Sequence, residues 1–156
     1  MPQVVCIVGK SKTDKTFLME GLICELKKRG LSVGALKHHT HGDFEIDIEG
    51  KDTWKYAKAG ADTVAISSPV KFAVIKNVEE EAGIDEICGR YFSQNNIVLA
   101  DGFTLSGKPR IIVADTTDDV SIFENGCNVV ALVGKSGMSP GDIPAIADKV
   151  LDFMEE

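Results

Sequence analysis

The chain alternates between short apolar runs and longer segments in which apolar residues recur at helical spacing. The run at residues 4–8 predicts a buried strand, and the spacing from Phe17 to Leu26 predicts a helix that stops at Gly30. The same patterns predict further strands at 32–37, 61–67, 70–76, 97–103, 108–115 and 129–133, with a short edge strand at 44–48. They predict helices at 50–60, 78–91, 118–125 and 143–154.

Strands that alternate with helices favour a mostly parallel sheet with helices on both faces. A chain of 156 residues is long enough for one well-formed core and short for two. Repeats, low-complexity tracts and linkers are absent from the sequence. We therefore expect an α/β fold of three layers, formed by a single domain over residues 1–156.

The turn after the first strand carries a phosphate-binding (Walker A) pattern. Gly9 to Thr16 matches G-x-x-x-x-G-K-[ST] except that Asp14 replaces the second glycine. In such a loop the backbone N–H groups and the following helix cradle phosphate, the lysine reaches the β- and γ-phosphates, and the hydroxyl binds magnesium. These two roles fall on Lys15 and Thr16. The predicted fold is therefore P-loop NTPase-like, and its predicted nucleotide contacts are Gly9, Lys10, Ser11, Lys12, Thr13, Asp14, Lys15, Thr16 and Phe17.

Asp14 places a carboxylate where phosphate should lie. At about 5 Å and an effective dielectric constant of about 20, one pair of like charges costs roughly 3 kcal/mol. That upper limit corresponds to about two decades of affinity. Three interpretations stay open: a working loop with weakened affinity, a degenerate loop in a non-hydrolysing adaptor, and an ordinary strand-to-helix turn.

A second candidate is Asp101, which ends the apolar run at residues 97–100 and is followed by Gly102. In parallel sheets ligands bind outside the carboxyl ends of the strands, and an apolar run that ends in Asp is typical of a magnesium-organising carboxylate in nucleotide hydrolases. Gly102 would allow the backbone to pass close to the ligand. The alternative is that Asp-Gly here only makes a turn.

All three histidines lie close together at His38, His39 and His41, directly after Lys37. Contact of this segment with an anion is one interpretation. A metal site completed by a nearby aspartate and a solvated polar turn are the others. Lys10 follows the first glycine of the loop, a position from which some P-loop proteins reach a nucleotide across a dimer interface.

The composition narrows the functional classes. A net charge of −7 argues against a broad basic surface for nucleic acid. No apolar run has the length of a transmembrane helix, and the first strand begins too early for a signal peptide, so we expect a cytoplasmic protein. The cysteines lack metal-ligand spacing, and we expect Cys6 and Cys24 to be reduced, buried thiols.

With these residues in view, the chain resembles the molybdopterin-guanine dinucleotide biosynthesis protein B (MobB) family from Val4 to about Asp115. The resemblance rests on the Gly9–Thr16 loop, Lys37-His38-His39-Thr40-His41, Gly50-Lys51-Asp52-Thr53 with Ala59-Gly60-Ala61, and Asp101-Gly102-Phe103. Asp14, Asp101 (usually Glu in the family) and Thr104 (usually Lys) depart from the family pattern.

The resemblance implies a homodimeric, magnesium-dependent GTP-binding protein, at most a weak GTPase. Such a protein assists a nucleotidyltransferase that attaches GMP to a molybdopterin-type cofactor. It further implies that Lys15 and Asp101 are catalytic, that Thr16 and Asp101 hold the metal, and that Lys37, His38, Asp52 and Gly102 belong to the pocket. A small-molecule kinase is a weaker alternative, because the few arginines form no obvious lid over a phosphate.

Overall fold

The structure is a computed structural model that describes residues 1–10, 12–134 and 138–155, without the side chain of Thr13. Its contacts divide the chain into two compact units. One consists of Met1–His39 with Gly83–Glu156, and the other is Thr40–Ala82. The two units are described separately.

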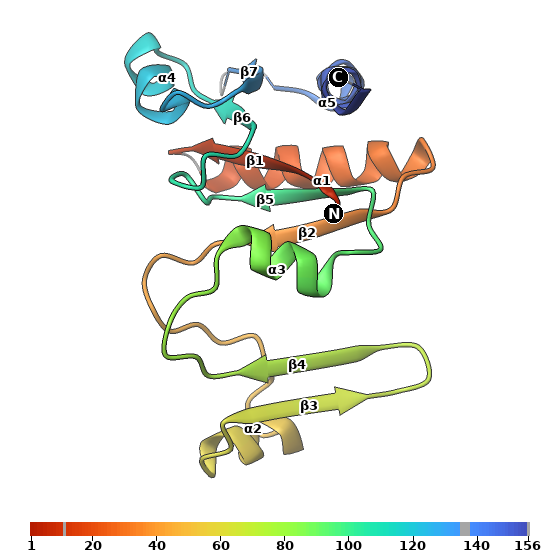
Figure 1. Cartoon of the computed structure of the whole chain (residues 1–156), viewed down its shortest axis with the longest axis vertical. Helices are drawn as coiled ribbons and strands as arrows, with labels where there is room; N and C mark the ends of the chain where they lie inside the picture. The colour runs from red at the N-terminus through yellow and green to blue at the C-terminus, as the bar shows by residue number, and fades with distance from the viewer. Residues whose placement is uncertain (11, 135–137, 156) are drawn as a thin grey trace. The chain divides into compact units, whose positions relative to one another are not determined.

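In the described part of the first unit, five parallel strands form one sheet in the order β2-β5-β1-β6-β7, which can be followed in Figure 1. Their bounds are β1 Gln3–Gly9, β2 Val33–Lys37, β5 Ile97–Asp101, β6 Arg110–Val113 and β7 Val129–Val133. The register aligns Asp101 with Ile7 on β1 and with Lys37 on β2. The ends of these three strands therefore lie side by side at one edge of the sheet.

Helices cover both faces of this sheet. Alternate strand residues such as Val5 and Ile7 pack with α1 (Lys12–Lys28) and α5 (Ile143–Glu155), which follows a short 3₁₀ turn at Pro140–Asp142. The intervening residues, such as Val98, pack with α3 (Ile84–Tyr91) and with α4 (Thr117–Glu124). This arrangement confirms the predicted three-layer α/β fold.

The first helix begins earlier than its apolar periodicity predicts. α1 starts at Lys12, so Lys12 to Thr16 are helical and the connection after Gly9 is short. Asp14 lies in the first turn of this helix, where a negative side chain is stabilised by the helix dipole. A glycine at the same position would disfavour helix by about 1 kcal/mol relative to Ala. The residue that breaks the loop pattern is thus one that suits an early helix start.

The predicted strands at 97–103 and 108–115 were too long, since β5 ends at Asp101 and β6 spans Arg110–Val113. Two further predictions were wrong in whole or in part. Residues 44–48 form no strand, because a strand needs a neighbouring strand to pair with and none of the described strands pairs with this segment. Helix α3 begins at Ile84 after an extended Gly83, so the acidic run at residues 79–81 lies outside it. The three adjacent carboxylates at residues 79–81 offer no apolar face that a helix could pack against the core.

The prediction of buried cysteines was right for Cys6 and wrong for Cys24. Cys6 and Cys88 are buried thiols, and burial raises the pKa of both. Cys24 is exposed, contrary to the prediction. It lies midway between the buried Leu22 and Leu26 on α1, and a helix turns that position toward solvent.

The second unit contains α2 (Asp52–Lys58) and an antiparallel hairpin of β3 (Thr63–Ser67) and β4 (Phe72–Lys76). The predicted turn is present, and the N–H of Ser68 donates to the carbonyl of Lys71 at 2.8 Å. Phe72 and Val74 both keep exposed side chains on β4. Within the described ranges of the whole chain, no helix has the length and apolar character needed to cross a membrane.

Candidate functional site

The predicted strand-end carboxylate lies at the centre of a charged cluster. Asp101 closes β5 between the neighbouring ends of β1 and β2, and it is only 7% exposed. Its Oδ1 is 3.5 Å from the ammonium of Lys15, and its Oδ2 accepts a hydrogen bond from the ammonium of Lys37. Three residues predicted from separate parts of the sequence therefore meet here.

One oxygen of this carboxylate keeps unused hydrogen-bonding capacity. Asp101 Oδ1 is buried and has no hydrogen-bond partner among the described residues, its distance to Lys15 being that of an ion pair. A buried carboxylate oxygen in this condition costs free energy unless a further group satisfies it. Water, a hydrated cation or a ligand donor would serve.

The residues after β5 hold the start of the histidine segment in place. The N–H of His38 donates to the carbonyl of Asp101 at 2.9 Å, and that of Gly102 donates to Ile7 at 3.0 Å. The Phe103 ring stacks on the His38 imidazole with centroids 4.5 Å apart. Gly102 has φ +98°, and a Cβ there would lie 3.1 Å from the Cβ of His38.

Phe103 is part of this cluster, although the sequence did not predict it as a site residue. Its φ is +53°, a left-handed conformation that costs a non-glycine residue roughly 1 kcal/mol or more. The stacking contact with His38 accompanies that strain. The motif Asp101-Gly102-Phe103 contains this residue, but neither its positive φ nor its stacking on His38 is visible in the sequence.

The turn between β1 and α1 is packed against β6 and α4. A side chain at Gly9 is impossible, since its Cβ would lie 2.4 Å from the carbonyl oxygen of Val113. Lys10 makes an ion pair of 2.5 Å with Asp119 in the first turn of α4. The sequence did not predict Asp119, because its partner lies more than a hundred positions away.

The remaining predicted loop residues are placed as follows. The Thr16 hydroxyl donates to the Lys12 carbonyl at 3.0 Å within the helix, Lys12 is exposed and Phe17 is half-buried. Ser11 and the side chain of Thr13 lie outside the described residues.

Asp52 belongs to the second unit, where it is the exposed first residue of α2. Its place in the pocket stays a prediction. Among the described residues, no three His, Cys, Asp or Glu side chains lie close enough to hold a metal ion. The structure therefore gives the metal interpretation of the three histidines no support.

The residues present fit a phosphate with magnesium. Lys15 and Lys37 supply two positive charges beside the N-terminus of α1, which itself favours an anion. The unused oxygen of Asp101 is the hard ligand that magnesium prefers, directly or through its water. Thr16 would add its hydroxyl by turning away from the Lys12 carbonyl.

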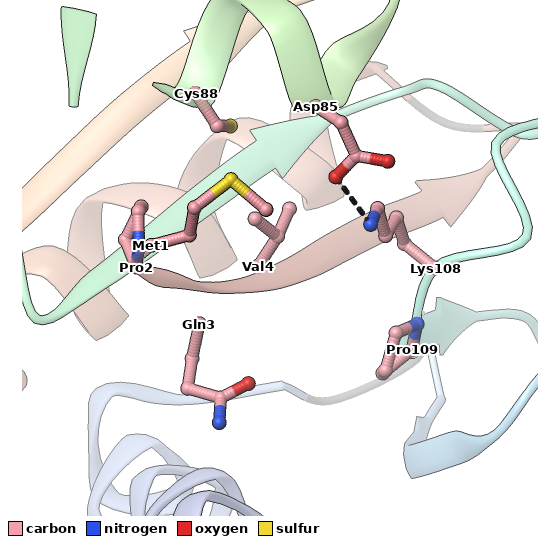
Figure 2. Close-up of a pocket in the computed structure, with 8 residues that line it drawn as sticks. All are labelled: Met1, Pro2, Gln3, Val4, Asp85, Cys88, Lys108 and Pro109. Carbon is pink, nitrogen blue, oxygen red and sulfur yellow. Dashed lines mark ion pairs between the residues drawn. The ribbon is translucent and has the colours of Figure 1, made fainter. Parts of the chain in front are cut away.

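A separate cavity lies at the opposite edge of the sheet. It has a volume of about 130 Å³, lies beside the start of β1, and contains the ion pair between Lys108 and Asp85 at 2.5 Å (Figure 2). Because ligands of parallel sheets bind at the carboxyl ends of the strands, we do not assign this cavity to the site around Asp101.

The parallel sheet, the short turn after β1 and the cluster at Asp101 define an α/β protein with a P-loop-like fold. The family model of Molybdopterin guanine dinucleotide synthesis protein B (MobB) matches residues 4–135. The chain belongs to this family, as its motifs predicted, and the family acts in the synthesis of molybdopterin guanine dinucleotide.

Known proteins agree with this assignment. A molybdopterin-guanine dinucleotide biosynthesis adapter protein of Haemophilus influenzae is 31% identical over 108 residues, which cover 69% of this chain and 60% of that protein. The adapter protein of Escherichia coli is 27% identical over 168 residues, covering 100% of this chain and 95% of that one. The chain thus spans about three fifths of the first relative and nearly all of the second.

Solved structures show the same likeness. A crystal structure of molybdopterin-guanine biosynthesis protein B is 32% identical, has a TM-score of 0.79, and is matched over 98% of this chain and 99% of that one. The crystal structure of Bacillus subtilis MobB is 25% identical with a TM-score of 0.76, over 96% of each chain.

Proposed function

We propose that this chain is a GTP-binding accessory protein in the synthesis of molybdopterin guanine dinucleotide. The observation that carries the proposal is the convergence of Lys15 and Lys37 on the buried Asp101, beside the N-terminus of α1. Membership of the MobB family supplies the pathway. The guanine nucleotide, its magnesium ion and the partner nucleotidyltransferase are parts of this proposal.

Each side chain has a distinct task. Lys15 and Lys37 leave the carboxylate of Asp101 and bind phosphate oxygens instead. The bound phosphate thus takes the place of two ion pairs that exist within the protein before it binds. Asp101 and Thr16 hold the magnesium ion, which neutralises phosphate charge when bound. Asp101 also orients the hydrolytic water if the protein turns GTP over.

The accessory role is tested by reconstitution. Molybdopterin, GTP and the partner nucleotidyltransferase are mixed with and without this chain, and formation of the guanine dinucleotide is followed. We expect the chain to stimulate the reaction and Lys15→Ala to abolish that stimulation. Lys28→Ala, an exposed lysine at the far end of α1, is the matched control. Equal product with and without the chain would contradict the role.

A second candidate, a non-hydrolysing adaptor with a degenerate loop, is favoured by the helical state of Lys12 to Thr16. In that case helix occupies the backbone that should wrap phosphate, and Asp14 repels it. The Asp14→Gly variant separates the two functions. A gain in GTP affinity approaching the hundredfold limit supports the adaptor, and an unchanged affinity shows that the carboxylate never faces phosphate.

We also propose a homodimer formed through the second unit. Phe72 and Val74 are two residues apart on β4, opposite Ser67 and Ala65 of β3, so their side chains lie on the same face of the hairpin. The side chains of Phe72 and Val74 are both exposed. An isolated two-stranded hairpin is marginally stable in water. A second copy of the chain would cover this apolar face.

A further inference from the structure

The strand that carries Lys37 is held on one side only. β2 is the edge of the five-stranded sheet and pairs with β5 alone among the described strands. The Lys37 side chain is 59% exposed, so packing does not fix its ammonium beside Asp101. The first unit ends two residues later, since Thr40 begins the second unit. The order of Lys37 therefore depends on what holds the residue that follows it.

His38, the residue after Lys37, is held through both its backbone and its side chain. Its N–H donates to the carbonyl of Asp101 at 2.9 Å. Its imidazole stacks on the Phe103 ring with the centroids 4.5 Å apart and an interplanar angle of 23°. The Phe103 ring also packs against the buried cluster that includes Val98 of β5. The ring thus connects His38 to the core of the first unit.

Phe103 makes this contact from an unfavourable backbone conformation. Its φ of +53° follows a φ of +98° at Gly102, and glycine adopts such angles without the steric cost that a bulky residue meets. Strained residues persist where the surrounding structure fixes them, and they cluster at ligand sites. Here the strained residue follows the site carboxylate by two positions, and its ring lies on the residue next to the site lysine.

The stacked rings therefore join the two chain segments whose side chains form the ion pair between Lys37 and Asp101. We propose that Phe103 is a positioning residue of the phosphate site. By stacking on His38 it fixes the end of β2, so that Lys37 stays where a phosphate oxygen would bind. Less conformational freedom is then lost on binding, which strengthens affinity. Phe103 acts through Lys37 and needs no contact with phosphate. This inference rests on the proposed nucleotide-binding function.

A double-mutant cycle tests whether Phe103 acts through Lys37. Phe103→Leu keeps an apolar side chain but removes the flat ring. We expect its affinity for GTP with magnesium, measured by calorimetric titration, to fall about threefold to tenfold. Phe103→Tyr keeps the ring and should retain the wild-type affinity. In a Lys37→Ala background, Phe103→Leu should cause no further loss, because residues that act as a unit give losses that do not add.

The matched control is Phe123→Leu, since Phe123 is a half-buried phenylalanine that packs against the same buried cluster. It should lower Tm as Phe103→Leu does and leave the affinity for GTP unchanged. If Phe103→Leu does not fold, His38→Leu removes the same stacking contact from the other side. The cycle with Lys37→Ala is then run with His38→Leu, and the same result is expected.

Three results would overturn the positioning role and leave GTP binding intact. They are losses from Phe103→Leu and Lys37→Ala that add, a Phe103→Leu variant that binds GTP as tightly as the wild type, and a Lys37→Ala variant with unchanged affinity. A wild type that binds no GTP would overturn the proposed function and this inference with it.

Discussion

Asp101 is the side chain on which the site depends, because its carboxylate joins Lys15 to Lys37 and is itself buried. Asp101→Asn removes the negative charge with little change of shape. We expect the variant to lose the magnesium dependence of GTP binding, since an amide is a weak magnesium ligand. Calorimetric titration with and without magnesium measures this. Asp152→Asn, an exposed residue of α5, should behave as the wild type, and a magnesium dependence that survives in Asp101→Asn would contradict the assignment.

Arg110 has a structural role, since it is fully buried and lies outside the charged cluster around Asp101. Its guanidinium donates to the carbonyls of Lys108, Thr104 and Phe123, at 2.8 to 3.2 Å. These bonds fasten the chain between β5 and β6 to the end of α4. One nitrogen, Nη2, has no hydrogen-bond partner among the described residues.

Arg110→Met should therefore destabilise the fold. Three carbonyls would lose a charged donor, and we expect a loss of about 3 kcal/mol in the free energy of unfolding. In a chain of this size that lowers Tm by roughly 10 °C, which thermal denaturation measures. Arg90→Met removes an exposed arginine that pairs with Glu86 within its own helix and should shift Tm by little. Equal shifts in the two variants would show that the buried bonds are unimportant.

Among the elements, α1 carries an acidic residue, Asp14, in its first turn, where the helix dipole favours a negative charge. Asp14→Gly removes a favourable charge from the first turn and raises the cost of helix there, together about 1 kcal/mol. We expect a fall in Tm of roughly 3 °C, with Asp14→Ala restoring part of it. An unchanged Tm in Asp14→Gly would mean that the first turn of α1 contributes nothing to stability.

The elements also show how far sequence patterns reach. Apolar runs located the five strands of the sheet. The signal is strongest in the central strands, which are buried on both faces and need apolar residues throughout, as Ile97 to Ala100 show. Alternation at residues 44–48 failed, because it reports side-chain periodicity and not whether a partner strand exists. The start of α1 was missed because a binding motif and a helical first turn use the same residues.

The residues of the site also divide into those that the sequence predicts and those that it does not. Lys15, Lys37 and Asp101 could be predicted because strand ends in a parallel sheet meet at one edge. Phe103 belongs to a motif of the family resemblance, but its role in the cluster could not be predicted, since it depends on a strained backbone angle. Asp119 could not be predicted either, since it depends on a contact between distant segments. The place of Asp52 in the pocket stays a prediction.

At the scale of the whole molecule, the exposed hairpin face predicts self-association. The double variant Phe72→Glu with Val74→Glu places charges on the apolar face that we propose a second copy covers. We expect it to sediment as a monomer at concentrations where the wild type is a dimer. Ile122→Glu changes an exposed apolar residue of α4 and should remain dimeric. A monomeric wild type would contradict the proposed dimer.

The central claim is that this chain binds a guanine nucleotide despite Asp14. Calorimetric titration of the unmodified protein with GTP and with ATP, each with and without magnesium, tests it most directly. We predict magnesium-dependent binding of GTP in the micromolar range or tighter, and much weaker binding of ATP. Binding of neither nucleotide would contradict the claim and leave the degenerate adaptor as the function of this fold.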